Sequence, residues 1–365
     1  MTESYQSLRA LFSDAGYAFV EPPILYEAGV FVELLGEELR RRLFLTADQD
    51  GTEMALRPDF TVPVALHHLA SGSARRKAGY AYLGPVFRHR ADEPDEFLQA
   101  GVESLGRTDR DAADADMLRL AFDAAALLGV RRPIARIGDS ALFAAVLDHL
   151  DIDLPWRGRL ARAYGDPVRL RALIGRAAEG GPVGAGDDGS LAGAGRLQIR
   201  RKVEQMFASA GLGIAGRTPA EIAARYAEKS ALAAGIGRKA AEALTSFLNI
   251  AGPAPAILPR LRALAQRDPM TIGKAVERFA KRLDAFAARD IDVSRLAFAA
   301  DFGRRLDYYT GFVFEMHVTK AGKPIVGGGR YDRLVSMIAR LRHETAVTVP
   351  AVGFSIWLDR IGGRR

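Results

Sequence analysis

Two segments near the C-terminus constrain this chain more than any other feature. The first is Arg304-Arg305-Leu306-Asp307-Tyr308-Tyr309-Thr310-Gly311, and the second is Gly327-Gly328-Gly329-Arg330-Tyr331-Asp332. Arginine carries a planar fork of donors that matches a carboxylate or a phosphate, and tyrosine combines a flat apolar face with one polar tip. Together they predict a pocket for a small charged ligand. The triple glycine favours a turn over a phosphate cradle, because no lysine with serine or threonine follows it as in a P-loop.

Composition narrows the class of protein further. The 365 residues, 48% hydrophobic and 26% charged, are typical of a soluble globular protein with one large domain or two smaller ones. The absence of cysteine excludes disulfides, thiolate metal sites and cysteine nucleophiles, and the scattered histidines do not suggest a zinc site, so neither metal nor cofactor is expected. The 51 basic and 44 acidic residues are interspersed, which gives a nucleic-acid partner little support. Without a signal peptide or a run of ~20 apolar residues, a cytoplasmic location and no membrane contact are expected.

Local patterns predict an α+β fold in which a helical segment separates two groups of strands. Residues 1–129 and 290–365 are expected to form one discontinuous domain, and residues 130–289 a mostly helical insertion with a glycine-rich loop near 178–195. Within the insertion, Thr218-Pro219-Ala220-Glu221 has the pattern of a capping box. Other predicted elements are helices over 5–15, 60–70 and 114–128, an extended edge over 17–25, a hairpin around Asp50-Gly51, strands over 79–89, 96–105 and 347–353, and a helix after Phe354.

Polar residues in the first half of the chain suggest one end of a ligand site. Gln99 and Glu103 are four residues apart, so on a strand they share a face, and Gly101 between them would leave room for a ligand. Such acceptors suit an ammonium group, while Arg304 could meet a carboxylate, so the implied ligand is an amino acid. Each residue also has a structural alternative: Asp59 could cap a helix starting at Phe60, Glu103 could be a surface residue, Arg304 could form an ion pair, and the tyrosines could be core residues.

The order of six segments resembles the catalytic domain of histidyl-tRNA synthetases over about residues 5–361. These segments are Leu56-Arg57-Pro58-Asp59, Gly84-Pro85-Val86-Phe87-Arg88, Gln99 with Gly101-Val102-Glu103, Arg304 with Leu306-Asp307-Tyr308-Tyr309-Thr310, the triple-glycine segment, and Ala351-Val352-Gly353-Phe354. The resemblance implies a class II aminoacyl-tRNA synthetase-like antiparallel sheet flanked by helices, and a dimer formed through the first helix and the Pro22-Pro23 region.

The same resemblance implies a histidine site made of three groups of residues. The α-amino group would be held by Asp59, Thr61 and Gln99. The imidazole would be surrounded by Glu103, Tyr309 and Tyr331. The carboxylate would face Arg304.

Departures from the synthetase pattern concern the nucleotide. Arg90 stands where the synthetases carry a glutamate, and the loop over residues 92–96 is acidic where they carry basic residues, which is electrostatically wrong for a polyphosphate. Trp357 takes the place of a glycine beneath the nucleotide, where its indole is expected to fill the space. Arg88, Trp357 and Arg360 would thus form a vestigial nucleotide site.

The pattern is closer to a relative of the synthetases. The chain ends five residues after Arg360, which leaves no room for an anticodon-binding domain, so tRNA is not expected as a partner. Residues 56–61 and 306–315 resemble the regulatory subunits of ATP phosphoribosyltransferase. That resemblance implies a protein without catalysis of its own that forms a homodimer within a hetero-oligomer, binds the short catalytic subunit of histidine biosynthesis and senses histidine.

Two alternatives stay open at the level of the sequence. Arg88, Arg304 and Arg360 are similar to arginines that hold phosphates in the synthetases, so a shortened enzyme could form an aminoacyl-adenylate for a tRNA or a non-tRNA acceptor. A scaffold with a vestigial pocket is the other alternative.

Overall fold

The computed structural model describes residues 3–34, 40–72, 76–150, 152–180, 201, 205, 218–266, 268–304, 308–345 and 347–361. They fall into two compact units, one formed by Met1–Leu142 with Ile250–Arg365 and the other by Phe143–Asn249. The glycine-rich loop expected near residues 178–195 lies outside the described residues from 181 onward. None of the described helices has both the length and the apolar character needed to cross a membrane.

A nine-stranded sheet forms the centre of the larger unit, in the order β1-β5-β6-β12-β11-β10-β7-β9-β8. The six strands from β5 to β7 are antiparallel to their neighbours, whereas β1 pairs with β5 and β9 pairs with β7 in parallel. The strands are β1 Ala18–Phe19, β5 Ala78–Phe87, β6 Glu96–Leu105, β7 Ile134–Asp139, β8 Ala251–Pro253, β9 Ala297–Ala299, β10 Phe312–His317, β11 Pro324–Arg330 and β12 Ala351–Trp357. The predicted antiparallel sheet is confirmed.

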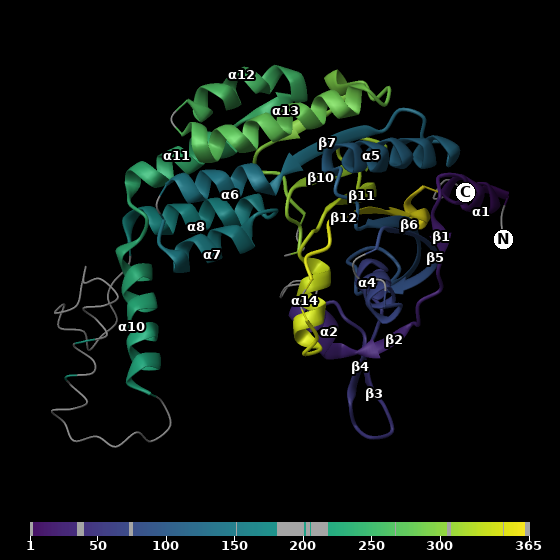
Figure 1. The fold of residues 1–365 in the computed structure, drawn as a ribbon, viewed down its shortest axis with the longest axis horizontal. Helices are drawn as coiled ribbons and strands as arrows, with labels where there is room; N and C mark the ends of the chain where they lie inside the picture. The colour runs from purple at the N-terminus through teal and green to yellow at the C-terminus, as the bar shows by residue number, and fades with distance from the viewer. Residues whose placement is uncertain are drawn as a thin grey trace. The chain divides into compact units, whose positions relative to one another are not determined.

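Helices cover one face of this sheet through aromatic contacts. The covering helices are α1 (Glu3–Asp14), α5 (Arg110–Leu127), α12 (Ala254–Ala265) and α13 (Lys274–Ala287), and Figure 1 shows α5 and α13 beside the sheet. Phe12 of α1 meets Phe354 of β12 with ring centroids 6.0 Å apart, and Phe286 of α13 meets Phe312 of β10 at 5.1 Å. Burial of these rings leaves the opposite face of the same strands for polar residues.

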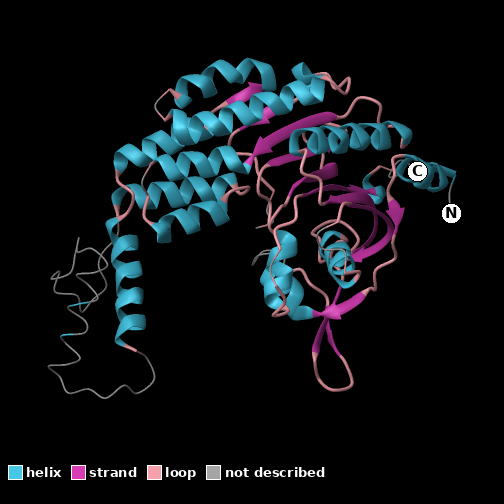
Figure 2. Ribbon diagram, viewed as in Figure 1, coloured by secondary structure: helices cyan, strands magenta, loops and turns pink. Residues whose placement is uncertain are grey.

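A second, three-stranded sheet lies in the same unit, and the strands of both sheets are magenta in Figure 2. It consists of β2 (Leu25–Glu27), β4 (Glu53–Leu56) and β3 (Leu45–Ala47), and β3 pairs with β4 as the predicted hairpin. Three further helices of this unit are α2 (Ala28–Leu34), α4 (Thr61–Ala70) and α14 (Leu334–Leu341), with α14 in contact with α2 and α4. The hairpin turn at Asp50-Gly51 follows the turn chemistry of the sequence, since Gly51 has φ +82°.

The described residues of the smaller unit form helices and short connections. Its helices are α6 (Ser140–His149, beginning in the larger unit), α7 (Leu154–Ala163), α8 (Pro167–Glu179), α10 (Pro219–Ala234) and α11 (Arg238–Leu248). The capping box is present at the start of α10, where the Glu221 carboxylate accepts from Thr218 N at 2.8 Å and Glu221 N donates to Thr218 Oγ1 at 3.3 Å. The unit spans fewer residues than the insertion predicted over residues 130–289. The difference arises because β7, α12 and α13 belong to the larger unit.

Two predictions about the C-terminal strands were wrong. The triple glycine lies in strand β11 and not in a turn, and the last strand continues past Gly353 to Trp357 with only a 3-10 turn, Leu358–Arg360, after it. Every residue of β12 is buried. A strand with both faces covered lacks the alternation that marks a half-exposed strand, so its end could not be located from hydrophobicity.

Candidate amino-acid binding site

The face of the main sheet opposite α5 and α13 carries three of the predicted site residues, Gln99, Glu103 and Trp357, within three rows of residues paired across its strands. Because side chains alternate along a strand, residues paired across neighbouring strands point to the same face. One row contains Gly84, Gln99 and Trp357, and the next contains Tyr82, Gly101, Ser355, Gly327 and Glu315. The third row contains Tyr80, Glu103, Gly353, Gly329 and Val313. Polar side chains therefore alternate with glycines across β5, β6, β12, β11 and β10.

The glycines in these rows make space for neighbouring side chains. A Cβ atom on Gly353 would overlap the carboxylate of Glu103, and one on Gly327 would overlap the guanidinium of Arg304. The space above Gly101, expected to receive a ligand, is instead taken by the Tyr82 ring, whose hydroxyl would lie 2.5 Å from an added Cβ. Glycine in these strands thus lets large polar side chains lie flat on the sheet.

Glu103 is the centre of a buried hydrogen-bonded cluster. It is 1% exposed, so it is not a surface residue. Its Oε1 accepts from Thr61 Oγ1 at 2.8 Å and from the Tyr82 hydroxyl at 3.4 Å, while Oε2 accepts from the Tyr331 hydroxyl. Burial raises the pKa of Glu103 to about 8, and the charge of Asp59 acts in the same direction. Thr61, predicted to bind the ammonium group of the ligand, and Tyr331, predicted to contact its imidazole, are therefore both hydrogen-bonded to Glu103.

Asp59 lies just before α4 and is close enough to Arg88 for their charges to interact. Its Oδ1 accepts from the backbone N–H of Val62 at 3.5 Å, so the alternative of a helix-capping residue is also present in the geometry. Burial raises the pKa of Asp59, against the opposing effects of the Arg88 guanidinium and the helix N–H groups. Burial likewise lowers the pKa of Arg88 to about 10, while the attraction of Asp59 opposes the change. The charges of Asp59, which is predicted to hold the ammonium group, and of Arg88, which is predicted to belong to the vestigial nucleotide site, therefore act on each other.

Arg304 lies across β11 at the other end of the site. Its Nη1 donates to Glu315 Oε1 at 3.2 Å, so the structural alternative of an ion pair is also present. The guanidinium carbon stands 5.8 Å from the centroid of the Tyr309 ring and 5.6 Å from that of Trp357. The Tyr309 and Trp357 rings therefore both lie beside the Arg304 guanidinium.

Three buried polar atoms of this face have no hydrogen-bond partner among the described residues. They are Gln99 Oε1, Arg304 Nε and Trp357 Nε1. Gln99 is 1% exposed and pairs directly with Trp357 across β6 and β12. Unpaired buried atoms are rare in folded proteins and point to a missing partner. One acceptor and two donors match a ligand that carries both a donor and an acceptor group.

Arg360, predicted to belong to the vestigial nucleotide site, is neutralised by Glu93 of the acidic loop. Arg360 Nε and Nη2 donate to the two carboxylate oxygens of Glu93 at 2.8 and 2.9 Å, and Nη1 donates to the Pro324 carbonyl at 2.6 Å. Lys323 Nζ lies 3.0 Å from the same carboxylate. Burial alone would raise the pKa of Glu93, but the hydrogen bonds from Arg360 and Lys323 hold it at about 2. A bidentate pair of this kind occupies the donors that a phosphate would need.

Arg90, which is expected to stand where the synthetases carry a glutamate, binds the same loop. Its Nη2 donates to Asp359 Oδ2 at 2.8 Å and its Nε to the Pro94 carbonyl at 2.8 Å, while its guanidinium lies 3.6 Å above the Phe97 ring. Trp357 completes the arrangement, because the Arg360 guanidinium stands 4.9 Å from its ring centroid. The acidic loop therefore folds back onto arginines of its own chain.

Sequence reasoning missed four residues of this face. Tyr82 shares a hydrogen bond with Ser355 Oγ at 2.8 Å, Glu315 pairs with Arg304, and the Tyr308 ring lies 5.8 Å from that of Tyr331. Glu315 could have been found, because it is a polar residue between the apolar residues Phe314 and Met316, a pattern typical of a strand. The residues that the structure describes contain no group of three or more histidine and acidic side chains placed to hold a metal ion.

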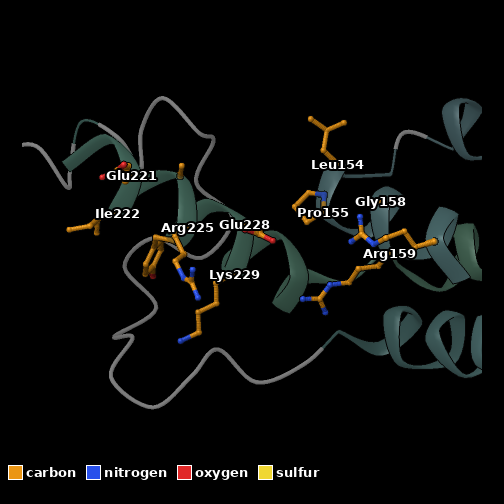
Figure 3. A pocket seen from close by; sticks show the side chains of 12 residues that line it. Leu154, Pro155, Gly158, Arg159, Glu221, Ile222, Arg225, Glu228 and Lys229 are labelled. Carbon is orange, nitrogen blue, oxygen red and sulfur yellow. The ribbon is translucent and has the colours of Figure 1, made fainter. Parts of the chain in front are cut away.

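A separate hollow of about 890 Å³ lies in the helical unit, between α7 and α10. Figure 3 shows Arg159 on its α7 side and Arg225 and Lys229 on its α10 side, with Glu221 and Glu228 among the other lining residues. None of the predicted site residues lines it.

Comparisons with known proteins agree with this geometry. A family model described as histidyl-tRNA synthetase matches residues 1–178 and 218–361. Two similar proteins are both named ATP phosphoribosyltransferase regulatory subunit. The one from Mesorhizobium japonicum is 40% identical over all of this chain and 99% of its own length. The one from Agrobacterium fabrum is 38% identical over 94% of this chain and 91% of its own length.

Solved structures with the same fold include both kinds of protein. One is described as an ATP phosphoribosyltransferase regulatory subunit/histidyl-tRNA synthetase from Bacillus halodurans, with a TM-score of 0.67 and 22% identity over 98% of this chain and 77% of that one. Another is a histidyl-tRNA synthetase from Nostoc, with a TM-score of 0.64 and 18% identity over 99% of this chain and 70% of that one. By its sequence the chain belongs to the family of ATP phosphoribosyltransferase regulatory subunits, whose fold is that of histidyl-tRNA synthetase.

Proposed function

We propose that this chain is a non-catalytic subunit that binds histidine in the site described above and regulates a short ATP phosphoribosyltransferase catalytic subunit. The relatives' shared name supports the partner, and the polar face of the main sheet supports the ligand. In this proposal the ammonium group meets Asp59, Thr61 and Gln99, the imidazole lies among Glu103, Tyr309 and Tyr331, and the carboxylate meets Arg304. The protein acts in the cytoplasm as a homodimer within a hetero-oligomer.

The observation that carries the ligand proposal is the set of unpaired atoms. Gln99 Oε1 needs a donor, which an ammonium group provides, and Arg304 Nε needs an acceptor, which a carboxylate provides. The Thr61–Glu103–Tyr331 cluster lies on the same face and offers polar partners for an imidazole. A zwitterion with a polar aromatic side chain satisfies all three regions.

The loop that binds back onto the chain supports a role without catalysis. Arg360 is held by both oxygens of Glu93, and the Trp357 indole lies beside it. An adenylate-forming enzyme needs cationic groups aimed at phosphates where charge develops in the transition state. Here the positive charge of Arg360 is already offset by a carboxylate of the same chain.

Regulation requires that histidine prefer one conformational state of the complex, because a ligand with equal affinity for both states does not shift the equilibrium between them.

The test measures histidine binding by calorimetry for the wild type and for Glu103→Gln and Arg304→Ala. A charge-assisted contact is worth roughly 1.5–3 kcal/mol, so Arg304→Ala should weaken binding at least about tenfold, and Glu103→Gln should do so above pH 8, where Glu103 is ionised. Co-purification with the short catalytic subunit should be unchanged, since neither residue is exposed.

Three results would contradict the proposal. The first is wild-type protein that does not bind histidine either alone or in the complex, as the scaffold alternative requires. The second is loss of assembly in both variants, which would make the two residues structural. The third is exchange of labelled pyrophosphate into ATP in the presence of histidine, which would establish the adenylate-forming alternative.

A further inference from the structure

We propose that Trp357 is a specificity residue of this site and that its indole N–H binds the carboxylate of the ligand beside Arg304. The inference rests on the proposed amino-acid site and goes beyond it. It gives a binding role to a side chain that sequence comparison with the synthetases assigns only to filling space.

The position of Trp357 follows from the register of the sheet. It is the last residue of β12 and pairs with Gln99 of β6, so both side chains lie on the ligand face. The side chain is only 5% exposed, yet its Nε1 has no hydrogen-bond partner among the described residues. Tryptophan N–H groups usually find a partner when they are buried. An unpaired N–H in this place therefore calls for an acceptor from outside the chain.

The charges around the indole identify that acceptor as an anion. The Arg360 guanidinium, 4.9 Å from the ring centroid, is bound by both carboxylate oxygens of Glu93. The Arg304 guanidinium, 5.6 Å away, donates to Glu315 through Nη1 and keeps an unpaired Nε. Arg304 Nε and Trp357 Nε1 are then two unpaired donors on neighbouring side chains. A carboxylate has two oxygens and can accept from both.

Gln99 fixes the class of ligand further. Its unpaired oxygen lies on the strand position opposite Trp357 and needs a donor. A ligand with an ammonium group next to a carboxylate, as in a free α-amino acid, can serve Gln99 and Trp357 together. An alcohol or an ester in place of the carboxylate leaves a neutral acceptor near Arg304, and buried donors bind neutral acceptors less strongly. Trp357 therefore selects a free amino acid over a derivative whose carboxyl group is reduced or esterified.

Trp357→Phe tests this role because it keeps a ring and removes the donor. Calorimetry with histidine and with histidinol, in which a hydroxymethyl group replaces the carboxylate, separates a carboxylate contact from general packing. We expect the variant to bind histidine about tenfold more weakly and histidinol within about twofold of the wild type. The matched control is Trp156→Phe at the only other tryptophan of the chain, whose N–H donates to the Leu232 carbonyl in the helical unit. It should leave both affinities unchanged.

A second measurement does not depend on the stability of the Trp357 variant. In Trp156→Phe protein, Trp357 is the sole tryptophan, so its fluorescence reports on this site alone. Histidine should shift its emission, and histidinol should shift it much less. Equal shifts with both ligands, no shift with either, or equal losses of affinity for both ligands in Trp357→Phe would overturn the inference while histidine binding by the wild type stands. Failure of the wild type to bind histidine would overturn the proposed function and this inference together.

Discussion

Replacing Glu103 with glutamine should remove a pH-dependent penalty on folding. Glu103 is 1% exposed and accepts hydrogen bonds from Thr61 and Tyr331, and burial raises its pKa from 4.5 to about 8. The folded protein therefore keeps a proton that the unfolded chain releases between these two values. The stability associated with this proton is fully present below pH 4.5 and is lost as the pH rises towards 8.

The magnitude follows from the size of the shift. At ~1.4 kcal/mol for each unit of pKa, the rise from 4.5 to about 8 corresponds to roughly 5 kcal/mol. Protonated glutamate and glutamine have nearly the same shape, so the two proteins should be about equally stable near pH 4.5. As the pH rises to 8, Glu103→Gln should become more stable than the wild type, by up to roughly 5 kcal/mol.

Urea unfolding at intervals between pH 4.5 and 8 measures this difference directly. The matched control is Glu96→Gln, because Glu96 lies on the same strand but is exposed. Its free energy of unfolding should follow that of the wild type at every pH. If Glu103→Gln also follows the wild type over this range, Glu103 titrates normally in the folded protein and the buried cluster described here does not form.

Two other predictions concern ion pairs that the fold buries. Arg282→Met should lower the free energy of unfolding by about 3–5 kcal/mol, measured by urea denaturation, because Arg282 is 2% exposed and bridges Asp114 and Asp139. In the variant Asp114 would keep Arg330, but the Asp139 carboxylate would lose its buried guanidinium partner. Equal stability of variant and wild type would contradict the network. Glu93→Gln should lower the melting temperature at pH 7 by breaking the pair with Arg360, and the difference should shrink as the pH falls from 4.5 towards 2, the pKa of Glu93. A difference that stays constant over that range would show that the pair contributes nothing.

Local patterns in the sequence were sufficient for a strand and a hairpin of the fold. A strand over residues 96–105 was predicted, with Gln99 and Glu103 on one face because they are four positions apart, and the register of β6 confirms that placement. The hairpin at Asp50-Gly51 was likewise predictable, because its turn needs a residue with positive φ. These features depend on neighbours within a few residues.

Features that depend on distant contacts were not predictable. The glycines of residues 327–329 suggested a turn, but their lack of side chains serves Arg304 and Tyr309, which approach the strand from another segment. The Arg360–Glu93 pair joins residues 267 positions apart. Sequence chemistry predicted that the acidic loop would repel a phosphate, yet it could not indicate which arginine the loop binds.

The proposed function requires that histidine binding in this chain control a separate catalytic subunit. The most direct measurement is the rate of the short ATP phosphoribosyltransferase subunit with and without this chain, over a range of histidine concentrations, with wild type and with Arg304→Ala. We expect that wild-type chain raises the rate, that histidine changes the rate of the complex, and that Arg304→Ala shifts this response to at least about tenfold higher histidine. A rate that is the same with and without the chain, or a histidine response that is identical for wild type and Arg304→Ala, would contradict it.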